Sequence, residues 1–285
     1  MPPVYIVCHL LLAGLCAVAA LRLPPHSAAR RLAGTVLVLL TTAGLFAERS
    51  AHWTAGVMAL RWPDAVFFTN LSLPLSAVLV ALLAQAARDR GSRVRAAVLG
   101  VGLVGVSLWS YTWYFAPLPD GLHGEVDGRG FCPQTSSDSC SAAAATMLLD
   151  RHGVPSNEAE MAQLCLTRSG RGTTPLGMFR GLTIAGGEAA LRPRLVRFDP
   201  ETRLRQLRQP ALVGVGLARN APADLVARME QYGWAPGLRH TILVERTDPA
   251  GEWIEVSDPT NGPERWPTRD LEHLWDGYAL ILEPN

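Results

Sequence analysis

Lysine is absent from the 285-residue sequence, so all 26 of its basic side chains are arginines. Charged residues of both signs make up only 18% of the chain, against about a quarter in an ordinary soluble domain. The net charge is only +1, and residues 121–285 hold seventeen arginines against twenty-one acids. A nucleic-acid-binding protein would need a basic face, which this balance excludes. The high apolar content also excludes a disordered chain.

Four long apolar runs fill the first half of the chain, and none contains an arginine or an acid. A helix needs about 20 apolar residues to cross roughly 30 Å of hydrocarbon. The last two runs meet this length, and the first two are slightly short and depend on their flanks. Four buried core helices are the alternative, disfavoured because no run shows a polar face. We therefore expect an all-α region of four membrane spans within residues 1–117, at residues 4–21, 32–47, 65–87 and 96–116. Pro74 lies inside the third run, where neighbouring helices would tolerate it.

The short loops between the runs give an expected orientation. The first loop contains Arg22, Arg30 and Arg31, and the third contains four arginines and one aspartate, whereas the loop at 48–64 is balanced in charge. Because arginine-rich loops stay in the cytoplasm, both termini are expected outside the cell membrane. Aromatic residues at 109–115 fit the outer interface. The first run is expected to be a retained anchor, since no positive side chain precedes it.

A linker rich in proline and glycine, residues 118–130, is followed by a stretch of 131–285 that is long enough for one hydrophobic core. Helical patterns come first, and β-branched, alternating patterns dominate afterwards. This order predicts an α+β domain with an antiparallel sheet. The expected helices are 141–152, a second from Ser156 to about 167, a third starting near Pro175, and 222–232. The expected strands are 191–198, 211–217, 240–247, 253–257 and 278–283.

Cys140 directly precedes an alanine-rich helical segment, where unpaired N–H groups and the helix dipole favour a thiolate. A thiol nucleophile needs a base and a group that orients the base. His240 opens one predicted strand and Asp258 ends the next, so a hairpin would bring them to the same end of the sheet. Glu245, in mid-strand, and Asp248, at the opposite strand end, compete with Asp258 for the orienting role. Six residues before Cys140, Gln134 is placed to help its N–H bind an oxyanion.

These motifs resemble the C39 peptidases and C39-like papain-fold proteins. The resemblance covers roughly 131–284 and includes the Gln-x5-Cys spacing, the later histidine, the turn formed by Asp258, Pro259 and Gly262, and the segment 275–282. It implies a papain-like fold with Cys140 as nucleophile, His240 as base and then acid, Asp258 as orienter and Gln134 in the oxyanion hole. It implies no metal or organic cofactor. The family often has Asp-Cys-Gly at the nucleophile, whereas here Ser139 and Ser141 flank Cys140.

Two further features remain open from sequence alone. The outer domain has three cysteines, and in an oxidising compartment we expect a Cys132–Cys165 disulfide that leaves Cys140 free. The glycine-rich loop at 169–177 either lines a substrate cleft or is a plain connector. It lacks the strand and lysine of a phosphate loop, so no nucleotide is expected.

The resulting prediction is a membrane-anchored cysteine peptidase that acts on a peptide or protein substrate outside the cytoplasm, with the lipid bilayer as its other partner. Two alternatives stay open. The first is a catalytically inactive C39-like module that binds a peptide or acts as a sensor, which the loss of Asp-Cys-Gly favours. The second is acyl transfer to an amine instead of water, which would use the same triad.

Overall fold

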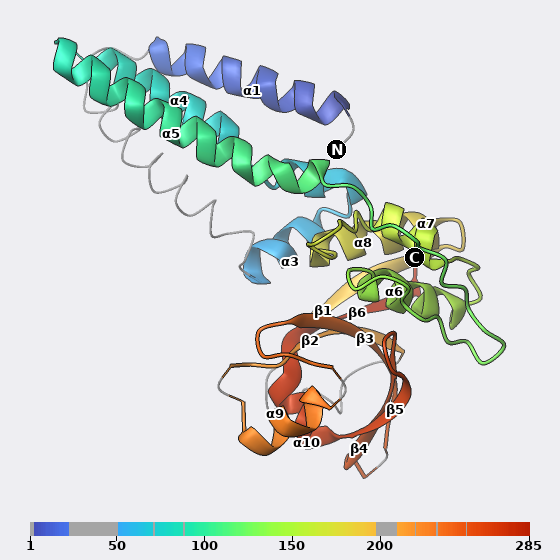
Figure 1. The fold of residues 1–285 in the computed structure, drawn as a ribbon. Coiled ribbons are helices and arrows are strands. Elements are labelled where there is room, and N and C mark those ends of the chain that lie inside the picture. The colour runs from blue at the N-terminus through green and yellow to red at the C-terminus, as the bar shows by residue number, and fades with distance from the viewer. Residues whose placement is uncertain are drawn as a thin grey trace. The chain divides into compact units, whose positions relative to one another are not determined.

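The computed structural model describes residues 3–22, 51–70, 72–87, 89–197, 210–219, 221–231, 233–248 and 250–285 (Figure 1). The chain divides into two compact units, Met1–Ala116 and Pro117–Asn285. The span expected at residues 32–47 lies outside the described residues.

The N-terminal unit is helical in its described part. Three of its stretches are long and apolar enough to cross a membrane, namely Val4–Leu21, Pro63–Ala86 and Arg90–Phe115. They overlap the first, third and fourth expected spans. A further short helix lies in the segment that was expected to be a loop. The elements are α1 (Pro3–Leu21), α3 (Ala51–Ala59), the 3-10 helix η1 (Pro63–Phe68), α4 (Ser72–Ala86) and α5 (Arg90–Phe115).

The second of these stretches, Pro63–Ala86, is interrupted between η1 and α4. Asn70 caps α4, because its side-chain oxygen accepts hydrogen bonds from Ser72 N (3.1 Å) and Ser72 Oγ (2.6 Å). Pro74 consequently falls in the first turn of α4, where backbone N–H groups have no intrahelical partner. Its missing N–H therefore costs the helix nothing there, and neighbouring helices are not needed to compensate for it.

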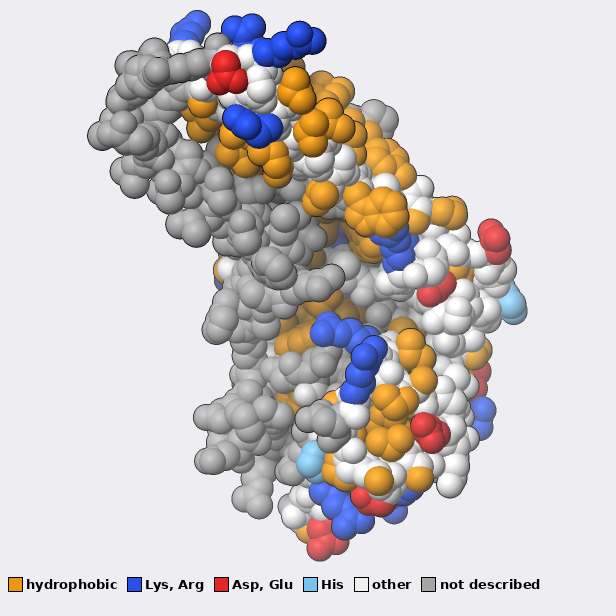
Figure 2. All heavy atoms as spheres, turned by 60° about the vertical axis from the view of Figure 1, so that its left-hand side comes forward, with side chains coloured by type: hydrophobic (Ala, Val, Ile, Leu, Met, Phe, Trp, Pro, Cys, Tyr) orange, Lys and Arg blue, Asp and Glu red, His pale blue; other side chains and the backbone are white. Residues whose placement is uncertain are grey.

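Hydrogen bonds fix the relative directions of the helices in this unit. Gln85 Nε2 donates to Leu21 O (2.7 Å) at one end, and Tyr5 Oη donates to Asp64 Oδ2 (2.7 Å) at the other, so α1 and α4 run in the same direction. Helix α5 runs against them, with Ser107 Oγ 2.7 Å from Ser76 Oγ. Arginine side chains gather at the end where α4 and α5 meet, and hydrophobic side chains cover the unit below them (Figure 2).

The C-terminal unit combines five helices and six strands among its described residues. The helices are α6 (Cys140–Asp150), α7 (Glu158–Leu164), α8 (Pro175–Gly187), α9 (Ala223–Glu230) and α10 (Thr268–Leu274). The strands are β1 (Leu191–Arg197), β2 (Ala211–Gly216), β3 (Arg239–Thr247), β4 (Trp253–Asp258), β5 (Gly262–Pro267) and β6 (Trp275–Pro284). The strands form one sheet in the order β1-β6-β2-β3-β4-β5, and every neighbouring pair is antiparallel. The expected α+β architecture with an antiparallel sheet is thus present.

Two elements were not expected from the sequence, β5 and α10. Strand β5 contains Pro263 and Pro267, which argue against a strand because proline cannot donate to a ladder. It is tolerated here because β5 is the edge strand and pairs only with β4 among the described strands. The cap of α7 also differs, since Asn157, and not Ser156, accepts the Glu160 N–H (2.9 Å).

The two faces of the sheet bury different elements. Helix α6 packs on β2 and β3, and α8 packs on β1. The opposite face holds an apolar cluster in which Val213 and Val215 of β2 meet residues of α9 and α10. Because side chains alternate along a strand, Gly214 and Gly216 lie on the face that carries α6.

Candidate active site

The candidate nucleophile is the first residue of α6. Cys140 is partly buried, while residues 141–149 of this helix are buried. The N-cap residue Ser139 makes no capping bond to the helix, since its hydroxyl donates to Glu158 Oε1 (2.6 Å) instead. The first-turn N–H groups therefore receive no side-chain cap and point, with the positive end of the helix dipole, towards the start of the helix. This position favours negative charge on sulfur.

His240 and Asp258 meet at one end of the β3–β4 hairpin. The His240 Nε2 lies 2.7 Å from Asp258 Oδ1, and the Asp258 side chain is fully buried. An ionised carboxylate can only accept, so Nε2 is the donor and Nδ1 is the nitrogen left for a second partner. The Asp258 carboxylate is held in turn by Thr260 N (2.8 Å) and Asn261 Nδ2 (3.3 Å). The imidazole is thus fixed in one tautomer and orientation.

Cys140 and His240 line the same cavity, and each shifts the pKa of the other. Burial opposes the thiolate, but the hydrogen bond and charge of His240 outweigh it and lower the pKa of Cys140. The Thr241 N–H and the Ser141 hydroxyl add to this effect. Burial also acts to lower the pKa of His240, but its bonds to Asp258 and Cys140 raise it to about 10. Both shifts favour the thiolate–imidazolium form of the pair over the neutral form.

The carboxylate that orients His240 stays charged. Burial acts to raise the pKa of Asp258, but the hydrogen bond and charge of His240 hold it below its usual value. Trp234 packs edge-on against the imidazole, with ring centroids 5.3 Å apart, and is itself buried. This aromatic contact excludes water from one side of the His240–Asp258 hydrogen bond, which strengthens it.

Gln134 lies close to Cys140 in the sequence, but its hydrogen bonds go to other residues. Its Nε2 donates to Ser136 O (3.1 Å), and its Oε1 is buried without a hydrogen-bond partner. Its backbone N–H donates to Pro259 O (2.9 Å), which ties this loop to the turn after Asp258. Among the described residues that line the cavity beside Cys140, Gln134 does not occur. Its oxyanion role remains a prediction.

Glu158 is a site residue that the sequence did not reveal. It is fully buried at the start of α7, and it accepts hydrogen bonds from Thr135 N (2.7 Å) and Gly124 N (2.8 Å) besides Ser139 Oγ. Burial acts to raise the pKa of Glu158, but the Ser139 and Thr135 bonds outweigh it and lower the pKa. A glutamate in the first turn of a helix normally lies at the surface and interacts favourably with the helix dipole. Here the carboxylate anchors the loop that leads to Cys140.

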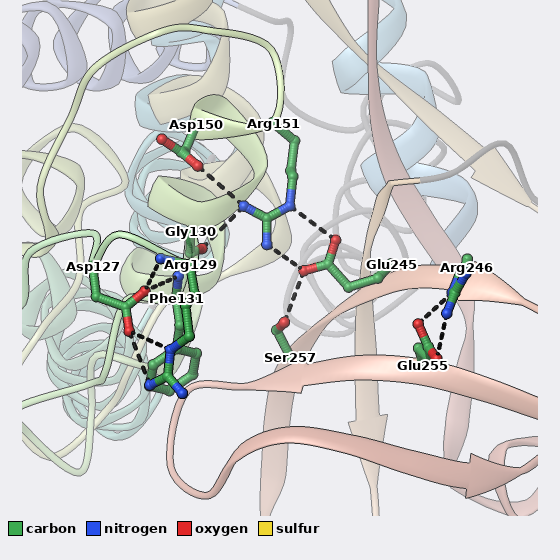
Figure 3. Close-up of polar contacts among 10 residues, drawn as sticks. All are labelled: Asp127, Arg129, Gly130, Phe131, Asp150, Arg151, Glu245, Arg246, Glu255 and Ser257. Carbon is green, nitrogen blue, oxygen red and sulfur yellow. Dashed lines mark hydrogen bonds and ion pairs between the residues drawn. The ribbon is translucent and has the colours of Figure 1, made fainter.

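The two competing carboxylates lie in other networks. Glu245 receives both ends of the Arg151 guanidinium, at 3.0 and 2.8 Å, and the Ser257 hydroxyl at 2.7 Å (Figure 3). Arg151 also donates to Gly130 O (3.1 Å), so this group fastens the linker to α6 and the sheet. Asp248 accepts from Glu252 N (3.3 Å) in the next turn. Among the described contacts, His240 is hydrogen-bonded to Asp258 and to neither Glu245 nor Asp248.

The expected Cys132–Cys165 disulfide is wrong, because both cysteines are free thiols. Cys132 lies near Glu158 at the start of α7, whereas Cys165 follows the end of this helix and packs against Gly181. The seven residues of α7 separate these ends by about 10 Å, beyond the reach of a disulfide. Burial raises the pKa of Cys132 and of Cys165 to about 12. Burial thus keeps these two thiols neutral, whereas the surroundings of Cys140 favour its thiolate.

A cavity of about 410 Å³ opens beside Cys140 and His240. Its walls include Gly170, Arg171 and Gly172, so the loop expected at 169–177 lines the cleft and is more than a connector. The loop folds back on itself through the Arg168 N to Gly172 O bond (2.9 Å). Its Gly170 N–H donates to Asp138 Oδ2 (2.7 Å), which joins it to the segment before Cys140.

No protein-family model matches the sequence, and no curated protein matches it closely enough to count as a relative. The structure is similar to a double glycine motif protease from an AMS/PCAT transporter in complex with the leader peptide, with 17% identity and a TM-score of 0.42 over 59% of this chain and 98% of that one. It is also similar to the peptidase domain of Streptococcus ComA, a bifunctional ABC transporter involved in quorum sensing, with 20% identity and a TM-score of 0.41 over 54% and 96%. A third similar structure is the N-terminal peptidase C39 like domain of a toxin secretion ATP-binding protein from Vibrio parahaemolyticus, with 12% identity and a TM-score of 0.34 over 53% and 100%.

The similarity to C39 peptidase domains, indicated by the motifs, is thus found among solved structures as well. At these identities and TM-scores it does not assign roles to individual residues.

Proposed function

We propose that this protein is a membrane-anchored cysteine peptidase that hydrolyses peptide bonds outside the cytoplasm. The observation that carries the proposal is the hydrogen bond of His240 to Asp258 beside a cavity that His240 shares with Cys140, the first residue of α6. A nucleophile, a base and an orienting carboxylate in this order are the requirements of acyl transfer.

The reaction follows from the charges of the resting pair. The Cys140 thiolate attacks the carbonyl carbon, and the oxyanion that forms is stabilised by the Cys140 N–H and by the second N–H of Gln134. The His240 imidazolium then gives its Nδ1 proton to the leaving amine, which leaves a thioester on Cys140. Water attacks this thioester, His240 takes the proton of the water, and the acid product departs as the thiolate is restored.

The anchor and the orientation are parts of the same proposal. Apolar side chains face outwards on the described helices of the N-terminal unit, with Val101 75% and Leu15 69% exposed. The arginines that follow α1 and begin α5 lie at one end of the unit, and Trp113, Tyr114 and Tyr5 lie at the other. Arginines at the cytoplasmic side and aromatics at the outer interface support a C-terminal domain outside the cell.

The test uses the intact chain in detergent with an undirected peptide mixture. The proposal is supported if the wild-type protein cleaves peptides and the Asp258→Asn and His240→Ala variants do not. Circular dichroism should show that both variants keep the wild-type fold. No turnover, together with a Cys140 that reacts as an ordinary thiol, establishes the non-catalytic binding module instead. An added amine such as glycinamide distinguishes acyl transfer from hydrolysis, because a transferase would form the amide product in preference to the acid.

Orientation is tested separately in intact cells. A membrane-impermeant maleimide should label Cys140 without lysis, as judged by mass spectrometry of the tryptic peptide. Labelling only after lysis would place the C-terminal domain in the cytoplasm.

A further inference from the structure

The residues that directly follow Cys140 and His240 in the sequence are in contact with each other. Ser141 is the second residue of α6, Thr241 lies near the start of β3, and their hydroxyl oxygens are 2.8 Å apart. Both residues are buried, and both line the cavity beside Cys140. This hydrogen bond therefore joins the start of the helix to the strand where the two elements carry Cys140 and His240.

The Ser141 hydroxyl also contacts the sulfur of its neighbour. Its Oγ lies 4.0 Å from Cys140 Sγ, at the outer limit of a hydrogen bond to sulfur. Either group can donate while the sulfur is a thiol, but a thiolate has no proton and can only accept. Ser141 is therefore the donor in this contact whenever Cys140 is ionised.

The two hydroxyl groups carry two protons, and the bond between them uses only one. If Thr241 donates, the proton of Ser141 is left for the sulfur of Cys140. If Ser141 donates instead, the proton of Thr241 has no acceptor among the described contacts of the pair. A buried donor without an acceptor costs free energy, so the order of donation from Thr241 to Ser141 to Cys140 is favoured.

The charge of Cys140 depends on the groups around its sulfur. Burial acts to raise its pKa, but His240, the Thr241 N–H and the Ser141 hydroxyl together lower it. A hydrogen bond donated to the charged form of a group stabilises that form. Ser141 also stands at the position where C39 peptidases often have a glycine, which has no hydroxyl to donate.

We propose that Ser141 donates a hydrogen bond to the Cys140 thiolate, and that Thr241 is a positioning residue that directs this hydroxyl towards the sulfur. The inference deepens the proposed peptidase function and rests on Cys140 as its nucleophile. A donor of this kind stabilises the thiolate before attack and lowers the pH at which Cys140 becomes reactive.

The test is the pH profile of Cys140 alkylation by iodoacetamide in the full chain, followed by mass spectrometry of the Cys140 peptide. Ser141→Ala should raise the midpoint of this profile by about 0.5 to 1 unit, the worth of one hydrogen bond. Thr241→Val, which keeps the backbone N–H, should raise it by about half as much, and Thr241→Ser should keep the wild-type midpoint. Thr146→Val is the matched control, because Thr146 is a buried residue of α6 whose hydroxyl donates to Ala142 O (3.0 Å), and it should change nothing.

The outcomes distinguish this inference from the function on which it rests. Raised midpoints in Ser141→Ala and Thr241→Val, with the wild-type midpoint kept in Thr241→Ser, support the proposal. A low wild-type midpoint that His240→Ala raises and Ser141→Ala does not would overturn the proposal and leave the peptidase intact. A shift in Ser141→Ala alone would overturn the positioning role of Thr241, and an equal shift in Thr146→Val would overturn the whole inference. An ordinary midpoint in the wild type would refute both the inference and the peptidase.

Discussion

The two units of this protein expose different kinds of side chain. In the N-terminal unit, Val101 and Trp109 are 75% and 73% exposed, while the Ser76–Ser107 hydrogen bond is buried. In the C-terminal unit the alanines of α6 are fully buried, and arginines such as Arg194 and Arg246 pair with glutamates at the surface. This contrast is consistent with the proposed arrangement, in which the first unit lies in a membrane and the second in water.

The largest expected difference between the two units is the effect on activity of replacing their cysteines. Cys140→Ala should reduce peptide hydrolysis about 10⁴-fold or more, because the residues of such a triad act as a unit. Cys8→Ala and Cys16→Ala in α1 are the matched controls and should leave the rate unchanged. Hydrolysis is followed by mass spectrometry of the peptide products. Activity retained in Cys140→Ala would contradict the mechanism.

The solvent of each unit is tested by placing an arginine on an exposed apolar position. Val101→Arg lies near the middle of α5 and should cost about 3 kcal/mol of membrane insertion. Ile184→Arg, at a position 37% exposed on α8, should change the free energy of unfolding by less than about 0.5 kcal/mol. Resistance to alkaline carbonate extraction reports the first effect and thermal unfolding the second. Equal tolerance at both positions would remove the distinction between the units.

Buried charge in the catalytic unit gives the next largest effect. Glu158→Gln should lower the free energy of unfolding by about 2 kcal/mol, because a charged acceptor of several buried hydrogen bonds becomes neutral. Alkylation of Cys140 should slow as Ser139 loses its anchor. Glu160→Gln, an exposed residue in the same turn, is the control and should change stability by less than about 0.5 kcal/mol. Identical melting curves for the two variants would show that Glu158 does not hold this loop.

The smallest effect is expected inside the anchor. Ser76→Ala removes the hydrogen bond to Ser107 and should destabilise the helical unit by only about 0.6 kcal/mol, the average for such bonds in membranes. Unfolding by a denaturing detergent would measure it. A loss of several kcal/mol would indicate that polar contacts, and not packing, hold these helices together.

Much of the fold was predictable from local pattern. Periodicity and length predict the secondary structure of three kinds of segment: the alanine-rich run after Cys140, the β-branched strands and the long apolar runs. Strand β5 escaped because its two prolines oppose pairing, and only its place at the sheet edge permits them. The role of Glu158 escaped because its partners, Gly124 and Thr135, come together only in the folded loop.

The candidate site, like the fold, was predictable only in part from the sequence. Cys140, His240 and Asp258 stand at element ends, where the sequence pattern predicts chemistry; His240 is hydrogen-bonded to Asp258 and lines the same cavity as Cys140, and their catalytic roles stay a prediction. The disulfide was wrong because pairing by elimination ignores the length of α7 between Cys132 and Cys165.

The most direct test of the account is the pH dependence of Cys140 alkylation by iodoacetamide. His240 stabilises the thiolate, so the wild-type rate should reach half its plateau well below the ordinary thiol pKa of about 8.5. The thiolate–imidazolium pair persists until His240 loses its proton near its pKa of about 10. In His240→Ala the midpoint should move up to the ordinary range or above it. A wild-type midpoint at or above the ordinary value, unchanged in His240→Ala, would contradict the account.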